Sequence, residues 1–493
     1  MAESGKINVQ GGSKMSHGRV YISDVLKGMK DLVSGRDKIN KGVKLISSQY
    51  TGTKVLPFKT FGVTARLERD GKVYLGTGVA PMATSGGVRE PEAVKDFRLA
   101  VAHLARLEER LNRGDKNLLN PLEVEEAVLE VDTILAKERK LLNPRPTSGI
   151  GSEVAIASTV ALLDAEAAYY GIPTALAMRA LLLHLQGENM NVDGLVSPLP
   201  KFNILNYGKH SGTKREDGLP HIWIQETKVA PVGAKDFEEA VAMGTEVLEK
   251  LIKIVGVDNI GFEAGISPAL TSPEQIYELT ARAIEKAGLV GKVIIAADAA
   301  ASEFSDPVKP GSDKFEYRLY PGEKPLDADG MVKFWEEMTR RYPIISIEDG
   351  MNSEDSKGWK MLMSSLGGKK EIQGDDLFVT DPDEITRFSD CANSVLIKPN
   401  QAGTLVRTLK AIAVARKLGY TISPSHRSGK VPGGYGIIPE LCLGTQAEWI
   451  KPGAPRRERA GFVNNVITMI DELKMLGIKV EFAGGKIVKR FKV

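Results

Sequence analysis

The feature that most constrains this chain of 493 residues is a regular alternation that begins after Pro200. Short apolar runs rich in β-formers alternate there with longer helical stretches, which is the pattern of a parallel sheet built from βα units. The runs are Lys201–Asn206, Ile222–Val229, Lys292–Asp298, Pro343–Asp349, Leu377–Thr380, Ser394–Lys398, Tyr420–Ser425 and Gln446–Lys451. Because eight parallel strands close a β/α barrel of this length, we expect a TIM-type barrel.

The segment between the first two runs makes this barrel irregular. Residues 207–221 are polar and rich in glycine, and they are too few to hold a crossover helix. Strands joined without a crossover run antiparallel, so we expect the first strand pair to be antiparallel. The expected fold class is therefore α/β: an irregular TIM-type β/α barrel preceded by a smaller α+β domain.

The residues before the barrel carry a different pattern. Lys54–Val79 contains two alternating runs around Asp70-Gly71, which predicts a β-hairpin. Apolar residues at helical spacing predict helices at Glu90–Arg113, Glu123–Leu142, Ser152–Ala167 and Thr174–Leu185. A hairpin followed by helices indicates an α+β region.

These patterns divide the chain into three segments. We expect a divergent and partly disordered N-terminal extension over residues 1–54, an α+β capping domain over 55–198, and the barrel domain with a C-terminal extension over 199–493. The last residues, Val480–Val493, are strand-like and basic, with Gly484-Gly485 as a turn. An added hairpin and a basic tail both remain open for them.

Composition excludes several classes of protein. Hydrophobic residues at 42% and charged residues at 26% are ordinary globular usage. The 66 basic and 63 acidic residues leave a formal charge of +3, which gives no general attraction to nucleic acid or to anionic membranes. Cys391 and Cys442 lie far apart, so neither a disulfide framework nor a thiolate zinc site is expected. We expect no nucleic-acid or membrane partner.

Two segments bear on location. The opening residues Met1–Arg19 are polar and lack an apolar core, so they do not resemble a signal peptide. The most apolar stretch, Val154–Ile172, carries Asp164 and Glu166 in its middle, which favours a buried helix over a membrane span. A cytoplasmic protein is expected.

Ionisable residues lie at or beside the ends of six successive runs, where barrel enzymes place their catalytic groups. They are Asp298, Glu348 with Asp349, Asp375 with Asp376 just before the run Leu377–Thr380, Lys398, His426 and Lys451. Solvated strand ends explain one or two such residues, but not six in strand order. This ring is the candidate active site.

Three carboxylates of the ring predict a metal site. Asp298, Glu348 and Asp375 offer hard oxygen ligands without cysteine or histidine, which suits Mg²⁺ better than zinc. Each alone is better explained as a salt-bridged strand end. The metal prediction therefore depends on the convergence of all three.

The basic and acidic partners indicate a reaction type. Lys398 and Lys451 near a cation should depress each other's pKa, which leaves one lysine neutral enough to remove a proton α to a carboxylate. Glu263 and Glu226 each follow an apolar run, and either could protonate a leaving hydroxyl. Arg427 and Ser428 beside His426 form a pairing that suits a phosphoryl group, although a helix cap with a surface arginine explains them too.

Several motifs extend this pattern in a fixed order. They are "SIED" ahead of a Trp-containing segment, "GDDLFVTDP", "VLIKPNQAGTL", "SHRSG" and "IKPGAP" followed by "ER", with "DAAASEF" and "APVGAKDFEEA" in further agreement. In order and separation they match the enolase family, the glycolytic phosphopyruvate hydratases. On these motifs the chain resembles that family over roughly residues 55–475.

The resemblance implies a role for each site residue. Lys398 would be the base at C2, Glu263 and Glu226 would assist hydroxide loss, and Lys451 would hold the substrate carboxylate. The other implied residues are Asp298, Glu348 and Asp375 for Mg²⁺, Arg427 and Ser428 for phosphate with His426 nearby, Gln225 on the carboxylate side, and His210 on a mobile loop. The implied reaction is the reversible dehydration of 2-phosphoglycerate to phosphoenolpyruvate by a homodimer that contacts through the smaller domain.

Departures from the family concentrate around the site walls. The family's lid begins with a serine that reaches a second Mg²⁺, and the aligned residue here is Pro81, which has no side-chain oxygen. Phe262 replaces an aspartate before Glu263, Lys430 replaces an acidic residue after "SHRSG", and the His210 loop is longer. A second Mg²⁺ is therefore not implied.

Three functions remain open from the sequence. The first is enolase activity with an altered lid. The second is an enolase-like lyase on a related phospho- or phosphono-carboxylate, similar to carboxyphosphonoenolpyruvate synthase, because Lys214, Arg215 and Lys430 suit a more negative substrate. The third is a non-catalytic enolase paralogue, although a structural barrel has no need for such a costly cluster of charges.

Overall fold

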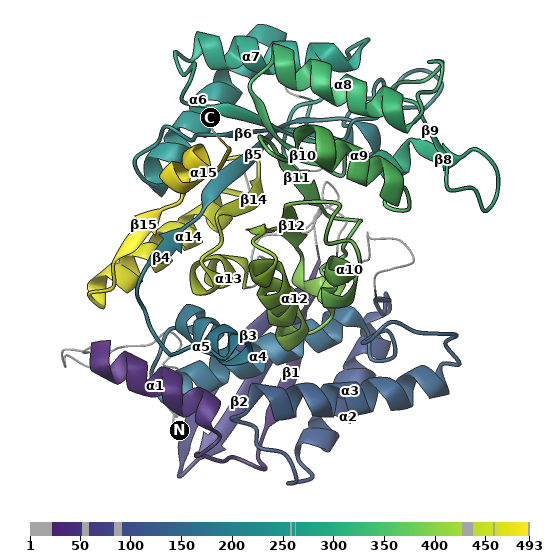
Figure 1. Cartoon of the computed structure of the whole chain (residues 1–493). Coiled ribbons are helices and arrows are strands. Elements are labelled where there is room, and N and C mark those ends of the chain that lie inside the picture. Colours follow the sequence, from purple (N-terminus) through teal and green to yellow (C-terminus); the bar gives the residue numbers. More distant parts are fainter. Residues whose placement is uncertain are drawn as a thin grey trace, which may run out of the picture.

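The computed structural model describes residues 22–51, 59–82, 91–256, 259–261, 263–425, 437–456 and 459–491. The earlier part of the chain forms one layer, drawn in purple and blue at the bottom of Figure 1, and the barrel lies above it. The two parts are in direct contact, since the backbone N–H of Leu405 donates to Thr159 Oγ1 at 3.2 Å.

The first part combines a three-stranded antiparallel sheet with five helices among the described residues. Its elements are α1 (Ile22–Ser34), β1 (Lys44–Thr51), β2 (Lys59–Arg69), β3 (Lys72–Pro81), α2 (Phe97–Leu111), α3 (Pro121–Glu138), α4 (Ser152–Tyr170) and α5 (Thr174–Gln186). The predicted hairpin is present as β2 and β3. Its turn residues Asp70 and Gly71 have φ of 51° and 73°, as a tight two-residue hairpin turn requires.

Helix α4 lies directly on this sheet. A Cβ at Gly76 would stand 2.2 Å from the Ala161 carbonyl oxygen, and one at Gly78 would stand 2.0 Å from that of Ala157. Only glycine permits so close an approach of strand and helix. The apolar stretch around Asp164 is thus a buried helix, as expected.

The predicted helices are present, and their bounds differ from the predicted ones by up to seven residues. Helix α2 begins at Phe97 instead of Glu90, because the Asp96 side chain accepts a hydrogen bond from the Leu99 N–H at 2.9 Å and caps the helix there. Strand β1 pairs with β2, so the three-stranded sheet also contains residues before residue 55.

The second part is a barrel of eight strands. They are β5 (Leu199–Asn206), β6 (Glu226–Ala230), β7 (Ile294–Asp298), β10 (Ile344–Glu348), β11 (Glu371–Gly374), β12 (Ser394–Ile397), β13 (Thr421–Pro424) and β14 (Trp449–Gly453). The sheet order is β13-β12-β11-β10-β7-β6-β5-β14, and a parallel bridge between Ser425 and Lys451 brings its two edges together. Strand β6 is antiparallel to β5, as expected, and also to β7.

One predicted strand is wrong. Residues Leu377–Thr380 form a turn, and the fifth strand is β11, a few residues earlier. Periodicity missed β11 because it carries Glu371 and Gln373, which are fully buried polar side chains. As a result Asp375 follows its strand instead of preceding it.

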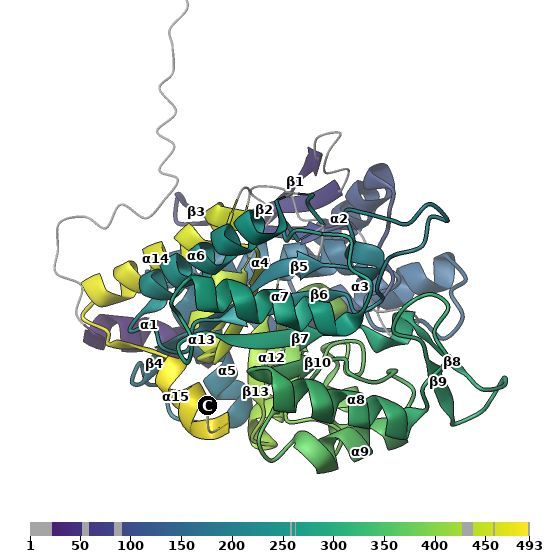
Figure 2. The ribbon, with the colours of Figure 1, turned by 90° about the horizontal axis from the view of Figure 1, so that it is seen from above.

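Helices surround the barrel strands, and Figure 2 shows several of them from above. They are α6 (Phe237–Val255), α7 (Pro273–Lys286), α8 (Ala328–Arg341), α9 (Ser356–Leu366), α10 (Pro382–Arg387), α11 (Pro399–Ala402), α12 (Leu405–Lys417), α13 (Ile438–Thr445) and α14 (Arg459–Met475). The remaining short elements are β4 (Leu195–Ser197), β8 (Ser305–Pro307), β9 (Phe315–Tyr317) and the 3₁₀ turns Gly208–His210 and Ala301–Glu303.

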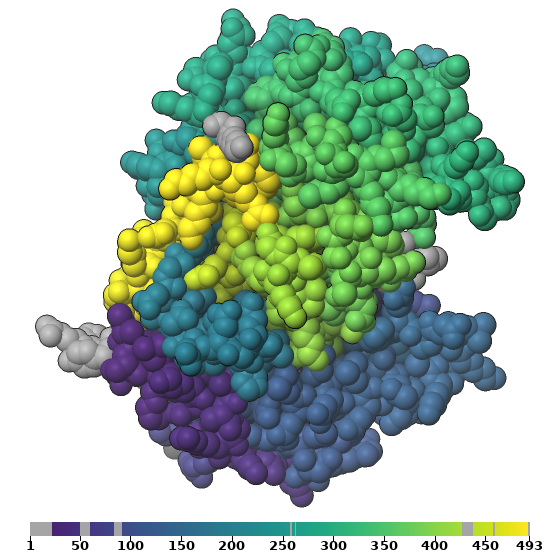
Figure 3. Space-filling view, in the orientation of Figure 1, coloured from purple at the N-terminus to yellow at the C-terminus, as the bar shows by residue number. Residues whose placement is uncertain are grey.

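The C-terminal residues are neither a hairpin nor a basic tail. Strand β15 (Val480–Phe482) pairs in parallel with β4, and α15 (Gly484–Phe491) follows it. This segment is part of the yellow surface at the left of Figure 3. Ile487 and Phe491 pack on Leu199, Ile294 and Trp449. Helix α15 therefore covers the end of the barrel at which the parallel strands begin.

The barrel interior next to α15 contains buried polar side chains that form an ion pair and hydrogen bonds with one another. Lys201 is fully buried, and its Nζ lies 2.5 Å from Glu371 Oε2, 3.1 Å from Ser346 Oγ and 3.3 Å from Gln373 Oε1. The same ammonium lies 4.3 Å from the centre of the Trp449 ring. A buried lysine is stable there because several acceptors compensate its charge.

Two further expectations concern compartment and membrane. Cys391 and Cys442 are free and buried, in line with the absence of a disulfide framework. Over the described ranges, no helix combines the length and the apolar character needed to span a bilayer.

Candidate active site

The carboxyl ends of the barrel strands bring the predicted residues together. Asp298 ends β7 and Glu348 ends β10, and the two are register partners. Asp375 directly follows β11, and Lys398 directly follows β12. Because β6 runs antiparallel, its first residue, Glu226, lies at this same end, opposite Asp298 in the register.

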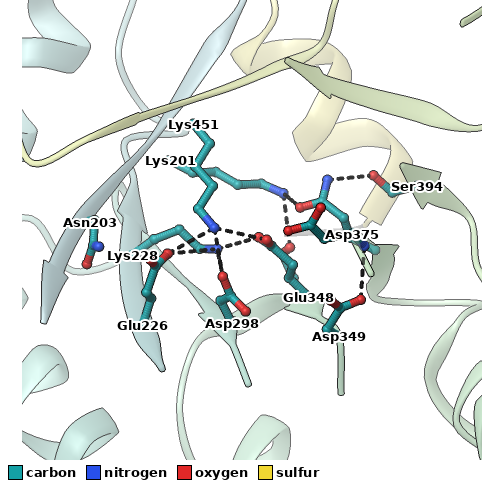
Figure 4. Close-up of polar contacts among 12 residues, drawn as sticks. Lys201, Asn203, Glu226, Lys228, Asp298, Glu348, Asp349, Asp375, Ser394 and Lys451 are labelled. Carbon is teal, nitrogen blue, oxygen red and sulfur yellow. Dashed lines mark hydrogen bonds and ion pairs between the residues drawn. The ribbon is translucent and has the colours of Figure 1, made fainter. Parts of the chain in front are cut away.

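Lys451 lies at the centre of this group (Figure 4). Its Nζ is 2.7 Å from Asp298 Oδ2, 2.9 Å from Glu348 Oε1 and 2.9 Å from Glu226 Oε2. Burial lowers the pKa of Lys451, but the three carboxylates outweigh it and hold the pKa well above its usual range. Lys451 is thus a charged ammonium surrounded by acids.

A second ammonium in this group was not predicted. Lys228 is fully buried, and its Nζ lies 2.5 Å from Glu348 Oε2, 3.5 Å from Asp298 Oδ2 and 3.9 Å from Glu226 Oε2. A sequence signal for it exists: Lys228 stands two residues after Glu226 in one strand, so both side chains point to the same face. Figure 4 shows both lysines directed at the same carboxylates.

Lys398 is held by the next carboxylate of the ring. Its ammonium pairs with Asp375 Oδ2, and Gln401 Nε2 donates to the other oxygen of Asp375 at 3.1 Å. Burial lowers the pKa of Lys398, but Asp375 and Asp376 outweigh it, and the pKa is raised. This direction is opposite to the expected depression, because the adjacent carboxylates of Asp375 and Asp376 favour the charged ammonium.

The acid candidates lie on the other side of Lys451. His210 Nδ1 is 2.9 Å from Glu226 Oε1, and Asn203 Nδ2 donates to Glu263 Oε2 at 3.3 Å. Burial raises the pKa of the Glu226 carboxyl, but Lys451 and His210 outweigh it, so the pKa falls below its usual range. Lys451 and His210 therefore favour the ionised form of Glu226.

Gln225 connects the loop to the barrel through its backbone. Its N–H donates to the Asp298 carbonyl at 3.1 Å, and its carbonyl accepts from the Tyr207 N–H at 2.8 Å. The Gln225 side chain is buried beside Glu226. The start of β6 is thereby fixed against both neighbouring strands.

Asp349 is hydrogen-bonded to the backbone that directly follows β11. Its two carboxylate oxygens accept hydrogen bonds from the N–H groups of Asp375 and Asp376, each at 2.9 Å. Its backbone adopts φ of 44°, a left-handed conformation that is costly for a residue other than glycine. Burial and the carboxylates of Asp376 and Asp375 raise the pKa of Asp349 well above its usual range.

The balance of charge at the barrel mouth fits a divalent cation. Its carboxylates are Glu226, Glu263, Asp298, Glu348, Asp349, Asp375 and Asp376, against the ammonium groups of Lys228, Lys398 and Lys451. Burial and the neighbouring Asp375 raise the pKa of Asp376 to about 8, which reflects this crowding of negative charge. Hard oxygen donors in excess are what Mg²⁺ requires.

The predicted metal ligands do not form one close group. Among the described residues, Asp349, Asp375 and Asp376 bring one oxygen each within 4.8 Å of one another, as do the ligand atoms of His210, Glu226 and Glu263. Asp298 and Glu348 instead face Lys451 and Lys228. Lysine ammonium groups thus occupy the neighbourhood in which we expected the metal.

Several predicted residues lie outside the described residues. They are His426, Arg427 and Ser428, together with Phe262 and Lys430. Pro81 is described: it is the last residue of β3 and is the register partner of Thr60 in β2.

Comparison with known proteins agrees with this architecture. A family model described as "Enolase, C-terminal TIM barrel domain" matches residues 194–491. A protein named enolase from Natranaerobius thermophilus is 36% identical over 359 residues, which cover 71% of this chain and 75% of that protein. The family match spans more than half of the chain and coincides with the observed barrel. The chain belongs to the enolase family.

Proposed function

We propose that this protein is a Mg²⁺-dependent lyase of the cytoplasm that reversibly dehydrates 2-phosphoglycerate to phosphoenolpyruvate, a reaction of glycolysis. The observation that carries the proposal is the grouping of Lys398, Lys451 and Glu226 with an excess of buried carboxylates at one barrel mouth. That combination suits removal of a weakly acidic proton followed by loss of a hydroxyl.

Lys398 is the proposed base. It takes the proton from C2 of the substrate, and the C–H electron pair is left on the substrate. Asp298, Glu348 and Asp375 would hold Mg²⁺, which would supply positive charge against the negative charge that grows on the substrate carboxylate. Lys398 needs a neutral amine for this step, so Asp375 must give up its ion pair with Lys398 when substrate and cation bind.

Glu263 and Glu226 are the proposed acids. A protonated carboxyl donates its proton to the C3 hydroxyl, which leaves as water while the electron pair at C2 forms the C2–C3 double bond. The proximity of both carboxylates supports a shared proton, since like charges in one site resist double ionisation.

The remaining residues are proposed to hold the substrate. Lys451 pairs with the substrate carboxylate, with Gln225 on the same side and His210 on the loop that closes over it. His426, Arg427 and Ser428 take the phosphoryl group. The family resemblance also supports a homodimer that contacts through the smaller domain, which sedimentation velocity of the purified protein would test.

One observation bears on the alternative substrates. The longer loop between β5 and β6 contains Arg215, whose Nη2 lies 3.2 Å from Asp217 Oδ2. This pair compensates part of the additional positive charge that would favour a more negative phosphono-carboxylate. The observation supports 2-phosphoglycerate as the first substrate to assay.

The proposal is tested by following the ultraviolet absorbance of the enol double bond with 2-phosphoglycerate and excess Mg²⁺. A rise that depends on Mg²⁺ is the expected result. If the absorbance stays constant with 2-phosphoglycerate but changes with a phosphono-carboxylate, the protein is a lyase of the second kind and the proposal is wrong. No reaction with either, in a protein that binds Mg²⁺, would favour a non-catalytic role.

A further inference from the structure

The proposed reaction leaves one ammonium group of the site without a role. Lys228 projects from the middle of β6 into the barrel, and no part of its side chain is exposed. Its Nζ contacts Glu348 at 2.5 Å and Asp298 at 3.5 Å, two of the three proposed metal ligands. The same atoms that would bind a divalent cation already bind a lysine.

Two buried lysines of the barrel can be compared. Lys201 on β5 pairs with Glu371, and further acceptors from Ser346 and Gln373 complete its shell. Among the described residues, each carboxylate within 4 Å of the Lys228 Nζ belongs to the candidate active site, namely Glu226, Asp298 and Glu348. Lys201 therefore forms a structural ion pair with Glu371, whereas Lys228 forms its ion pairs with carboxylates of the candidate active site.

The energetic consequence follows from Coulomb's law. A divalent cation on Glu348 and Asp298 would lie close to the Lys228 ammonium, and two positive charges a few ångströms apart in a buried site repel strongly. To bind the cation, Glu348 and Asp298 must also give up the ion pairs that they already form with Lys228. Both effects oppose metal binding.

We infer that Lys228 is a resident cation that competes with the divalent ion for Glu348 and Asp298, and thereby lowers the metal affinity of this site. Lys228 is a positioning residue, because it acts on the metal ligands and not on the substrate. The inference rests on the proposed function only in taking Glu348 and Asp298 as metal ligands.

The test is calorimetric titration of the full-length protein with MgCl₂ in the absence of substrate. Lys228→Met removes the charge and keeps most of the side-chain length, and Lys228→Gln is a second neutral variant in case the first does not fold. Each neutral variant should bind Mg²⁺ about tenfold tighter or more than the unaltered protein, because one nearby positive charge is gone.

The matched control is Lys201→Met combined with Glu371→Gln. It removes a buried lysine from the neighbouring strand together with that lysine's own carboxylate partner, and should leave the Mg²⁺ affinity within about twofold. Thermal unfolding gives a second readout that needs no turnover. Without metal, Lys228→Met should unfold at a lower temperature than the unaltered protein, and Mg²⁺ should raise its unfolding temperature by more.

Equal or weaker Mg²⁺ binding by both neutral variants would overturn the inference, as would an absence of Mg²⁺ binding in all of the proteins. Failure of the proposed function is a separate result. A protein that is inactive on 2-phosphoglycerate, but whose neutral variants bind Mg²⁺ more tightly, keeps the inference and loses the proposed reaction.

Discussion

Each buried lysine at the barrel mouth is stabilised by one or more neighbouring carboxylates. Lys451 is matched by three carboxylates and Lys398 by Asp375, and these residues could be predicted because they stand at strand ends in the sequence. Lys228 lies inside a strand, where an isolated lysine usually faces solvent, and its sequence signal is only the two-residue spacing from Glu226. Only the fold shows that this face of β6 points into the barrel.

The first prediction concerns the proposed base. Lys398→Ala should lower turnover of 2-phosphoglycerate by about 10²–10⁴-fold or more, the range typical for loss of a general base. It should leave Mg²⁺-dependent thermal stabilisation in place, because the carboxylates are retained. The matched control is Lys410→Ala, an exposed lysine on α12, which should keep full activity. Unchanged turnover in Lys398→Ala would remove Lys398 from the mechanism.

The second prediction concerns the lid. Pro81 has no side-chain oxygen at the position where the family has a metal-binding serine, so Pro81→Ser should raise the Mg²⁺ stoichiometry from one ion to two per chain in the presence of substrate. Equilibrium dialysis with metal analysis measures this number. If the stoichiometry stays the same, Pro81 is not the cause of a missing second ion.

Among the elements, sequence periodicity identified the strands that lie within or beside an apolar run and failed on β11, which has none. Strand β11 has the sequence Glu-Ile-Gln-Gly, and its Glu371 is buried only because Lys201 reaches it from a strand that is distant in the sequence. Likewise α15 was not predicted, because its short amphipathic pattern gains a partner only when the barrel end is formed. Both elements depend on contacts that a local pattern does not contain.

The third prediction tests the packing of α15. Ile487 is fully buried against the closed end of the barrel, so Ile487→Ala should lower the free energy of unfolding by about 2–5 kcal/mol. Denaturant unfolding measures the change. The exposed neighbour Lys489→Ala should have little effect. Turnover should be unchanged in both variants, because α15 lies at the opposite end of the barrel from the site. A loss of activity in folded Ile487→Ala would contradict this separation.

At the scale of the whole molecule, helix α4 joins the two parts and carries buried acids. Burial raises the pKa of Glu153 to about 8 and that of Glu166 well above its usual range. Both carboxyl oxygens of Glu166 are buried without a hydrogen-bond partner among the described residues. Since the folded protein keeps these protons at pH values where the unfolded chain has lost them, stability should fall as pH rises above about 4.5.

The fourth prediction follows from that linkage. Glu166→Gln has nearly the same shape as the protonated acid but does not titrate, so the fall in stability above about pH 4.5 should become shallower by up to about 1.4 kcal/mol per pH unit. The variant should therefore be more stable than the unaltered protein at pH 8 and little changed at pH 4. Chemical unfolding across this range measures both, with exposed Glu278→Gln on α7 as control. An identical pH profile in Glu166→Gln would show that Glu166 is ionised in the folded state.

The central claim is that Lys398 removes the C2 proton of 2-phosphoglycerate at the mouth of this barrel. The most direct measurement is proton NMR of 2-phosphoglycerate in D₂O with Mg²⁺, which follows exchange of the C2 hydrogen separately from dehydration. The C2 signal should disappear with the unaltered protein and remain with Lys398→Ala. Retention with the unaltered protein, or equal exchange in both proteins, would contradict it.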